Sequence, residues 1–409
     1  MLRALTLSAF LLAPAAAQAF NQCTATPLTG AGGEIAQEGA NPISVGKWVY
    51  AGFMDGGKVG VAVSSDSGKT LGQPVILASG DGAAKSLRLA ASGTDVYAIW
   101  HVKLHGAAHL MFDVSRANGA AGSWDAPVDF GPVTNNLPQL VASDSYVHIA
   151  YIATDGNVYA VSSANRGRKF LAPVPLGPGS IEVAAAGDGA HLYVTWEMEP
   201  TKKHYEVMMA SSADNGASFS TQNLSHGRPD NADEPILTVA EPGGRVSLIW
   251  RDASKIPTGY YLQSADGGRT WSAPLAVDGP ARQFMVADDG RTIYVSYLKQ
   301  VTVDGVFDYQ VTVATSTDGG LSFPNKQNLT GMTGISKILA DDFRPIPWVG
   351  RERAFRLTGI KADGVYVWSG RDGRISRETF LGPGYLAAPA LDSSVWQSAD
   401  GAVSYGVCR

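Results

Sequence analysis

Short segments in which apolar and polar residues alternate run along most of the chain. They are rich in β-branched and aromatic residues, and polar turns separate them. Alternation with a period of two predicts strands, and no segment has the period of a helix. Four strands form a unit. Residues 234–277, for example, hold two strands in EPILTVAEPGGRVSLIW, a third in GYYLQS and a fourth in SAPLAV. We therefore predict an all-β chain.

A recurring octapeptide joins the third strand of each unit to the fourth. It contains a serine, an aspartate, a glycine and a hydroxyl residue at alternate positions, followed by a large apolar residue. Near-complete copies begin at Ser64, Ser212, Ser264 and Ser316. Degenerate copies begin at Ser115, with a two-residue insertion, at Ser163, with Asn165 for the aspartate, and at Ser369. The seven starts are 48 to 53 residues apart. Seven units of four strands predict a β-propeller with seven four-stranded blades.

The aspartates of the near-complete copies are predicted to be structural. They are Asp66, Asp214, Asp266 and Asp318. An aspartate in a turn accepts hydrogen bonds from nearby backbone N–H groups, and a glycine supplies the positive φ. Because every unit carries some version of the motif, it suits the architecture better than a single catalytic centre.

The motif S-x-D-x-G-x-[TS]-[WF] resembles the Asp-box, or BNR repeat, of the sialidase-like propellers, over nearly the whole mature chain. Sialidases are six-bladed, so six blades stay open as an alternative. The resemblance implies a ligand site at the channel mouth, on the face opposite the boxes. It implies no single function, because other polysaccharide-active propellers and non-enzymatic ones, such as the photosystem II assembly factor, also carry the box.

For a working sialidase the resemblance implies an arginine triad on the substrate carboxylate, an aspartic acid, and a tyrosine nucleophile paired with a glutamate. The family's F-R-I-P motif stands before the first box, and nothing like it precedes Ser64. The nearest match, FRPIP at Phe343–Pro347, lies in the last unit. No catalytic residue can be transferred by motif, so whether the chain is an enzyme stays open.

Residues 1–19 are expected to be a secretory signal peptide. They contain Arg3, the apolar run Leu5–Ala13 and the cleavage site Ala17-Gln18-Ala19. The apolar run is shorter than the ~20 residues of a spanning helix, and we expect no other segment to cross a bilayer. Residues 20–409 are then a single propeller domain, secreted or periplasmic.

Two cysteines, Cys23 and Cys408, stand near the ends of the mature chain. In an oxidising compartment they are expected to form a disulfide that closes the ring; two free thiols are the alternative. The terminal hairpin, SSVWQS to AVSYGVC, is expected to pack beside the first blade.

The chain has 32 lysine and arginine residues against 37 aspartate and glutamate, a net charge of −5. This balance argues against nucleic acid as the main partner. Residues 343–377 depart from it, with eight basic residues against three acidic ones. This basic last blade could dock a protein or an acidic glycan, or be an ordinary solvated edge. We expect a monomer without a cofactor.

The repeat predicts which side chains surround the channel mouth. Second strands end at an aromatic residue followed by a variable one, and first strands begin with a polar residue. As catalytic candidates this pattern, with the neighbouring loops, offers Glu197, Glu182, His101 and Tyr260; as ligand-binding candidates it offers Arg88, Arg251, Arg282 and Lys337. Guanidinium groups match carboxylate and sulfate oxygens. The alternative is that these are rim charges that pair with one another.

Three histidines, His101, His105 and His109, are spaced four residues apart. If a hairpin is centred on His105, then His101 and His109 face each other, a geometry that could hold a metal. Without a carboxylate partner we expect a solvated loop and no metal.

The leading functional hypothesis is an exported propeller that binds or processes an anionic carbohydrate at the mouth. As an enzyme it would be a glycoside hydrolase or another polysaccharide-active enzyme. The alternative is a non-catalytic binding or assembly propeller that holds a protein partner.

Overall fold

The computed structural model describes residues 24–29, 34–35, 42–78, 85–225, 231–240, 244–303, 305–330, 347–349, 354–361, 364–382, 384–389, 393–398 and 403–407. All regular elements among these residues are β-strands. This part of the chain contains no helix that is long and apolar enough to cross a membrane. The predicted all-β class is confirmed.

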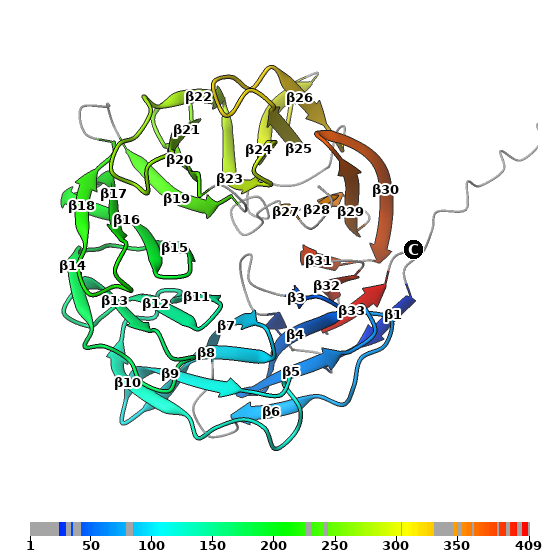
Figure 1. Cartoon of the computed structure of the whole chain (residues 1–409). Coiled ribbons are helices and arrows are strands. Elements are labelled where there is room, and N and C mark those ends of the chain that lie inside the picture. Colours follow the sequence, from blue (N-terminus) through cyan, green and yellow to red (C-terminus); the bar gives the residue numbers. More distant parts are fainter. Residues whose placement is uncertain are drawn as a thin grey trace, which may run out of the picture.

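The strands form antiparallel sheets arranged in a ring, with β7, β11, β15, β19, β23, β27 and β31 toward the centre (Figure 1). The first four blades contain these strands. Blade 1 has β2 (Glu34–Ile35), β3 (Ile43–Val45), β4 (Trp48–Asp55), β5 (Lys58–Ser64) and β6 (Val75–Ala78). Blade 2 has β7 (Lys85–Ser92), β8 (Asp95–Leu104), β9 (Ala107–Ser115) and β10 (Val128–Val133). Blade 3 has β11 (Gln139–Ser143), β12 (Tyr146–Ile152), β13 (Asn157–Ser163) and β14 (Val174–Pro178). Blade 4 has β15 (Val183–Asp188), β16 (His191–Thr201), β17 (His204–Ser212) and β18 (Ser220–Asn223).

Three more blades and a closing sheet complete the ring. Blade 5 has β19 (Ala232–Val239), β20 (Val246–Asp252), β21 (Thr258–Ser264) and β22 (Leu275–Asp278). Blade 6 has β23 (Ala281–Asp288), β24 (Ile293–Val303), β25 (Val306–Ser316) and β26 (Asn325–Asn328). Blade 7 has β27 (Pro347–Val349), β28 (Ala354–Lys361), β29 (Gly364–Arg371) and β30 (Arg374–Gly382). The closing sheet has β1 (Thr24–Pro27), β31 (Gly384–Pro389), β32 (Ser393–Ser398) and β33 (Val403–Val407).

The seven predicted units are confirmed as seven blades, each with a box between its last two strands. In blade 1, β2 and β3 both pair with β4 and share the innermost position.

The ring also contains the closing sheet, which has no box and has the order β1-β33-β32-β31. Its hairpin packs beside blade 1, as predicted, because Val403 and Tyr405 join a core with Val49, Ala51 and Phe53. The chain ends are thereby joined, since Thr24 pairs with Val407. Cys23 and Cys408 lie outside the described residues, and their disulfide stays a prediction.

The box of blade 5 shows why its aspartate is structural. The N–H and the hydroxyl of Thr270 donate to Oδ1 and Oδ2 of Asp266, at 2.9 and 2.6 Å. The Ser264 hydroxyl donates to the same carboxylate at 2.8 Å and accepts the Gly268 N–H at 2.8 Å. The Thr270 hydroxyl and N–H and the Ser264 hydroxyl lower the pKa of Asp266 to about 2. The same bonds recur around the other three aspartates.

Each box also supports an interface between blades. The Gly373 N–H in blade 7 donates to the hydroxyl of Tyr294 in blade 6, at 3.0 Å, and the Tyr405 hydroxyl of the closing sheet donates to the Gly68 carbonyl, at 2.7 Å. Gly320, at φ 85°, lies so close to Tyr261 of the preceding blade that a Cβ would approach a ring carbon to 2.7 Å. Glycine is therefore required both for the left-handed turn and for the close approach.

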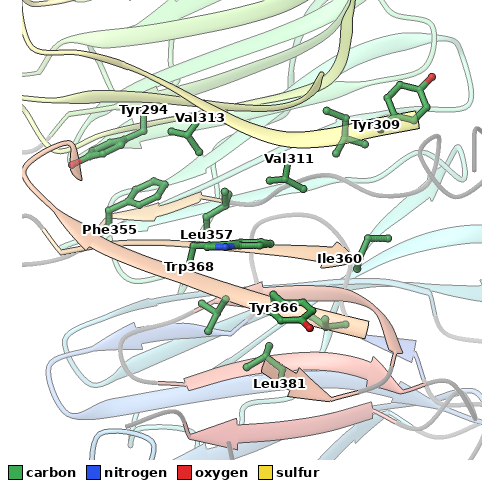
Figure 2. Close-up of a cluster of buried hydrophobic side chains, with 13 residues drawn as sticks. Tyr294, Tyr309, Val311, Val313, Phe355, Leu357, Ile360, Tyr366, Trp368 and Leu381 are labelled. Carbon is green, nitrogen blue, oxygen red and sulfur yellow. The ribbon is translucent and has the colours of Figure 1, made fainter. Parts of the chain in front are cut away.

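Aromatic and aliphatic side chains fill the space between adjacent blades. Figure 2 shows one such interface, where Tyr294 and Val313 of blade 6 meet Phe355 and Leu357 of blade 7. The rings of Tyr294 and Phe355 stack with centroids 4.3 Å apart. Because these side chains are fully or almost fully buried, the interface contributes the apolar burial that stabilises a ring of sheets.

We predict that Asp266→Ala lowers the melting temperature measured by circular dichroism, because the turn loses every bond to the carboxylate. Asp266→Asn is the matched control. Blade 3 already uses an asparagine, and Asn165 Oδ1 accepts the Lys169 N–H at 2.9 Å. The asparagine variant should therefore lose less stability than the alanine variant. Equal losses would contradict the role of the Oδ1 bonds.

Candidate functional site

The boxes and the channel mouth lie at opposite ends of the blades. In blade 2, Lys85 at the start of β7 pairs with His101 near the end of β8, which defines the mouth end. Ser115, where the box begins, pairs with Val96 at the other end of β8. The residues predicted to surround the mouth are therefore far along the strand from the turns that stabilise the blades.

A cavity of about 230 Å³ lies at this mouth end, between the first strands of blades 2 to 6. Its lining combines one guanidinium, one carboxylate, three amides and a set of apolar side chains. They are Arg88, Glu182, Asn135, Asn136, Gln139, Leu137, Ile181, Val183, Ala184, Pro235, Ile236 and Met285. The structure thus brings together two predicted residues, Arg88 and Glu182. Sequence reasoning missed the two asparagines, although polar residues just before a first strand were the available signal.

A second group of charged side chains lies where blades 4 and 5 meet at the mouth. Arg251 donates through Nε and Nη2 to the carboxylate of Asp233, at 2.8 and 2.7 Å. Its Nη2 is also 3.0 Å from Glu234 Oε1. The predicted ligand-binding arginine therefore neutralises two carboxylates of its own blade. For Arg251 the structure therefore agrees with the alternative interpretation, in which charged residues at the rim pair with one another.

Glu197 is a carboxyl group that is buried close to other carboxylates. It is 3% exposed, and its Oε1 accepts the Glu234 N–H at 2.7 Å. Burial raises its pKa to about 8; the Glu234 N–H opposes this, and the carboxylates of Glu182, Asp233 and Glu234 add to it. Burial also raises the pKa of Asp233 to about 6 despite Arg251. At neutral pH Glu197 is therefore mostly protonated, while Asp233 stays ionised beside Arg251.

Strained backbone occurs at the same point in three first strands. Ser86, Glu234 and Gln283 have φ values of 59°, 51° and 56°, in the left-handed region that residues other than glycine rarely adopt. Each lies at a shift in strand pairing, which is a β-bulge. Such outliers concentrate at functional sites and cost of order 1–3 kcal/mol each. Their common place in three blades makes this bulge a repeated feature of the blade at its mouth end.

Other predicted site residues are not brought to this cavity. Tyr260 lines a separate, very small cavity of about 10 Å³ with Tyr205 and Trp250. The Arg282 guanidinium lies 5.3 Å from the Tyr309 ring centre. Lys337 lies outside the described residues.

The prediction that His101 and His109 face each other is wrong. The turn of this hairpin falls at His105-Gly106, so that His101 pairs with Leu110 and Val102 with His109. A shift of one residue puts His101 and His109 on opposite faces of the sheet. His101 is buried, which lowers its pKa to about 4, and His109 contacts Asp129 at 2.9 Å. Among the described residues, no three histidine, cysteine or acidic side chains could hold a metal.

The basic last blade is only partly described. Lys361 donates to Glu378 at 2.6 Å and lies 4.4 Å from the Tyr366 ring centre. This lysine is therefore paired within its own sheet. Part of the basic stretch, including residues 350–353, lies outside the described residues.

We predict that Glu197→Gln stabilises the protein at pH 7 and above. The folded state raises the pKa of Glu197 from 4.5 to about 8. The contribution of protonated Glu197 to the free energy of unfolding is therefore complete below pH 4.5 and is lost as the pH rises toward 8. A glutamine keeps an acceptor for the Glu234 N–H and cannot ionise, so the gain at pH 7 should be about 3 kcal/mol. Urea unfolding at pH 7 measures this gain, and the same experiment at pH 5 and pH 8 should give a smaller and a larger one. Glu199→Gln, on the exposed end of the same strand, is the control. An equal gain at pH 5 and pH 8 would contradict the assignment.

Comparisons with known proteins give information about the fold of the chain and none about its candidate site. No family model matches the chain, and no curated protein matches it. Among solved structures, the polysaccharide lyase Uly1 is 11% identical over 78% of this chain and 89% of its own, with a TM-score of 0.49. The Hadza microbial sialidase Hz136 is 11% identical over 74% of this chain and 73% of its own, with a TM-score of 0.41.

A prolyl endopeptidase structure is 12% identical over 93% of this chain, with a TM-score of 0.50. The match covers 54% of that chain, so the protein described here spans about half its length. At such identities the likeness concerns the fold alone. With a box in each of its seven blades, the chain has the architecture of a sialidase-like Asp-box β-propeller.

Proposed function

We propose that the channel mouth opposite the boxes binds an acidic carbohydrate. The observation that supports this most directly is the cavity of about 230 Å³, with Arg88, three amides and Glu182 in its lining. A guanidinium matches a carboxylate or sulfate with two parallel hydrogen bonds. Amide and carboxylate groups can bond the hydroxyls of a sugar, and the apolar lining can contact the faces of its ring.

The proposal gives the two charged residues of the lining different tasks. Arg88 would bind the acidic group of the ligand. Glu182 would accept hydrogen bonds from hydroxyls, and it is the candidate carboxylate for acid–base chemistry if the glycan is cleaved. Glu197 has no place in the lining of this cavity, so any part it takes would be indirect.

Arg88→Ala should weaken binding of an acidic glycan by about 1.5–3 kcal/mol, or roughly ten- to a hundredfold, the usual range for a hydrogen bond to a charged group. Arg88→Lys keeps the charge without the planar fork and should have an intermediate effect. An array of neutral, uronate, sialylated and sulfated glycans identifies the ligand, and titration calorimetry gives the affinities. Asp266→Ala, at the opposite end of blade 5, should keep normal affinity.

A fluorogenic sialoside assay alongside the array separates the functional classes. Turnover supports a hydrolase, and binding without turnover supports a lectin-like module. No response in either assay would contradict the proposal and favour the assembly propeller that holds a protein partner.

We also propose that the protein is exported and that Cys23 and Cys408 form a disulfide. Thr24 and Val407, the neighbours of the two cysteines in sequence, pair directly in the closing sheet, which supports the bridge. Intact mass of protein from the medium or periplasm should correspond to a chain that begins at Phe20. Unfolded without reductant, it should take up no alkylating agent. Labelling of both cysteines would contradict the bridge, and an uncleaved, cell-retained chain would contradict export.

A further inference from the structure

Glu197 joins two blades at the mouth. It lies near the end of β16 in blade 4, and its Oε1 accepts the N–H of Glu234 in β19 of blade 5, at 2.7 Å. Its own N–H donates to the Glu182 carbonyl at 3.2 Å. Glu182 lines the cavity, so Glu197 links one wall of the cavity to the next through its backbone N–H and its carboxyl group.

The bond falls on the strained residue of the blade 5 bulge. Glu234 has a φ of 51°, and strand pairing shifts between Asp233 and Ile236. The next two residues, Pro235 and Ile236, line the cavity, and the residue before Glu234 is Asp233, which pairs with Arg251. The conformation of this bulge therefore decides both the shape of the wall and the position of the ion pair.

This contact is not a general feature of the blades. Arg251 occupies the same position in blade 5 as Glu197 does in blade 4, one residue after the tryptophan of the second strand. The second strands do not end at this tryptophan, as the sequence predicted, because β16 and β20 continue past it. Arg251 bonds Asp233 within its own sheet. In blade 6 the corresponding residue is Leu298, which is fully buried and has no side-chain acceptor.

We propose that Glu197 is a positioning residue of the mouth: by accepting the Glu234 N–H it holds the blade 5 bulge in the conformation that puts Pro235 and Ile236 into the cavity wall. It acts through Glu234 and does not contact the ligand. The effect on ligands rests on the proposed function, whereas the effect on the bulge does not.

The charge of Glu197 matters to the same wall. The charged groups that face it are Glu182 beside it and Asp233, Glu234 and Arg251 across the blade interface. With its pKa raised to about 8, mainly by burial, Glu197 is mostly uncharged at pH 7. At pH 9 it adds a negative charge next to Glu182. An acidic ligand should then bind more weakly, and a neutral one should be less affected.

Hydrogen exchange tests the positioning role without any ligand. In Glu197→Leu the peptide that contains residues 232–236 should exchange about tenfold faster, because one buried hydrogen bond is lost. Glu197→Gln keeps the acceptor and should exchange no faster than the wild type. Leu298→Ala, which destabilises the mouth end of blade 6, controls for general loosening and should leave this peptide unchanged. Should Glu197→Leu fail to fold, Glu197→Met serves as the variant without an oxygen acceptor. Exchange in the folded variant equal to that of the wild type would overturn the proposal.

Affinity for N-acetylneuraminic acid at pH 7 and pH 9 tests the role of charge. We expect wild-type binding to weaken by about fivefold at pH 9 and Glu197→Gln to show no such loss. The same loss in both proteins would overturn the charge effect and leave the exchange result standing. If this sugar and every glycan on the array fail to bind at both pH values, the proposed function fails, and the exchange experiment alone decides the role of Glu197.

Discussion

The structure depends on the contact between each blade and the next, and above all on the contact that closes the ring. A blade is a four-stranded sheet with two faces, and both faces need a partner if their apolar side chains are to be buried. In a linear stack the two end blades would each expose one face. Here the closing sheet provides the missing partner, with β1 beside β33, Val403 and Tyr405 against blade 1, and β31 against blade 7. The hydroxyl of Tyr405 on Gly68 joins this sheet to the first box, just as Tyr294 meets Gly373 between blades 6 and 7.

This rigid frame allows the mouth to carry features that oppose stability. A buried carboxyl with a raised pKa and three left-handed residues in first strands cost folding free energy. A protein under selection for stability alone would replace Glu197 by an uncharged residue. The carboxyl groups at the box end show the reverse pattern, because these exposed carboxylates accept bonds that favour the charged form. The carboxyl group that burial keeps protonated and the carboxylates that the boxes keep ionised thus lie at opposite ends of the blades.

Much of this fold followed from the sequence because its signals are local. The alternation of residue types predicts strands, and the box predicts a turn from a few adjacent residues, so that seven copies in register predict seven blades. The placement of Arg88 and Glu182 at one mouth followed from the same repeat, since residues at equivalent points of equivalent blades lie at the same end of the ring. The closing sheet was less evident. It has no box, and its strands come from both ends of the chain.

The remaining features needed the tertiary structure, because they depend on distances between residues far apart in sequence or on a register that sequence does not specify. One residue of register separates a facing pair of histidines from His101 and His109 on opposite faces. Arg251 looked available for a ligand until the blade 5 bulge placed Asp233 and Glu234 against it. Glu197 became a buried carboxyl only where blade 4 meets blade 5. The sequence alone determined the repeat, the turns and the end of the ring where charged side chains gather. Only the packing of one blade on the next decided which of those charges pair, which are buried, and which line the cavity.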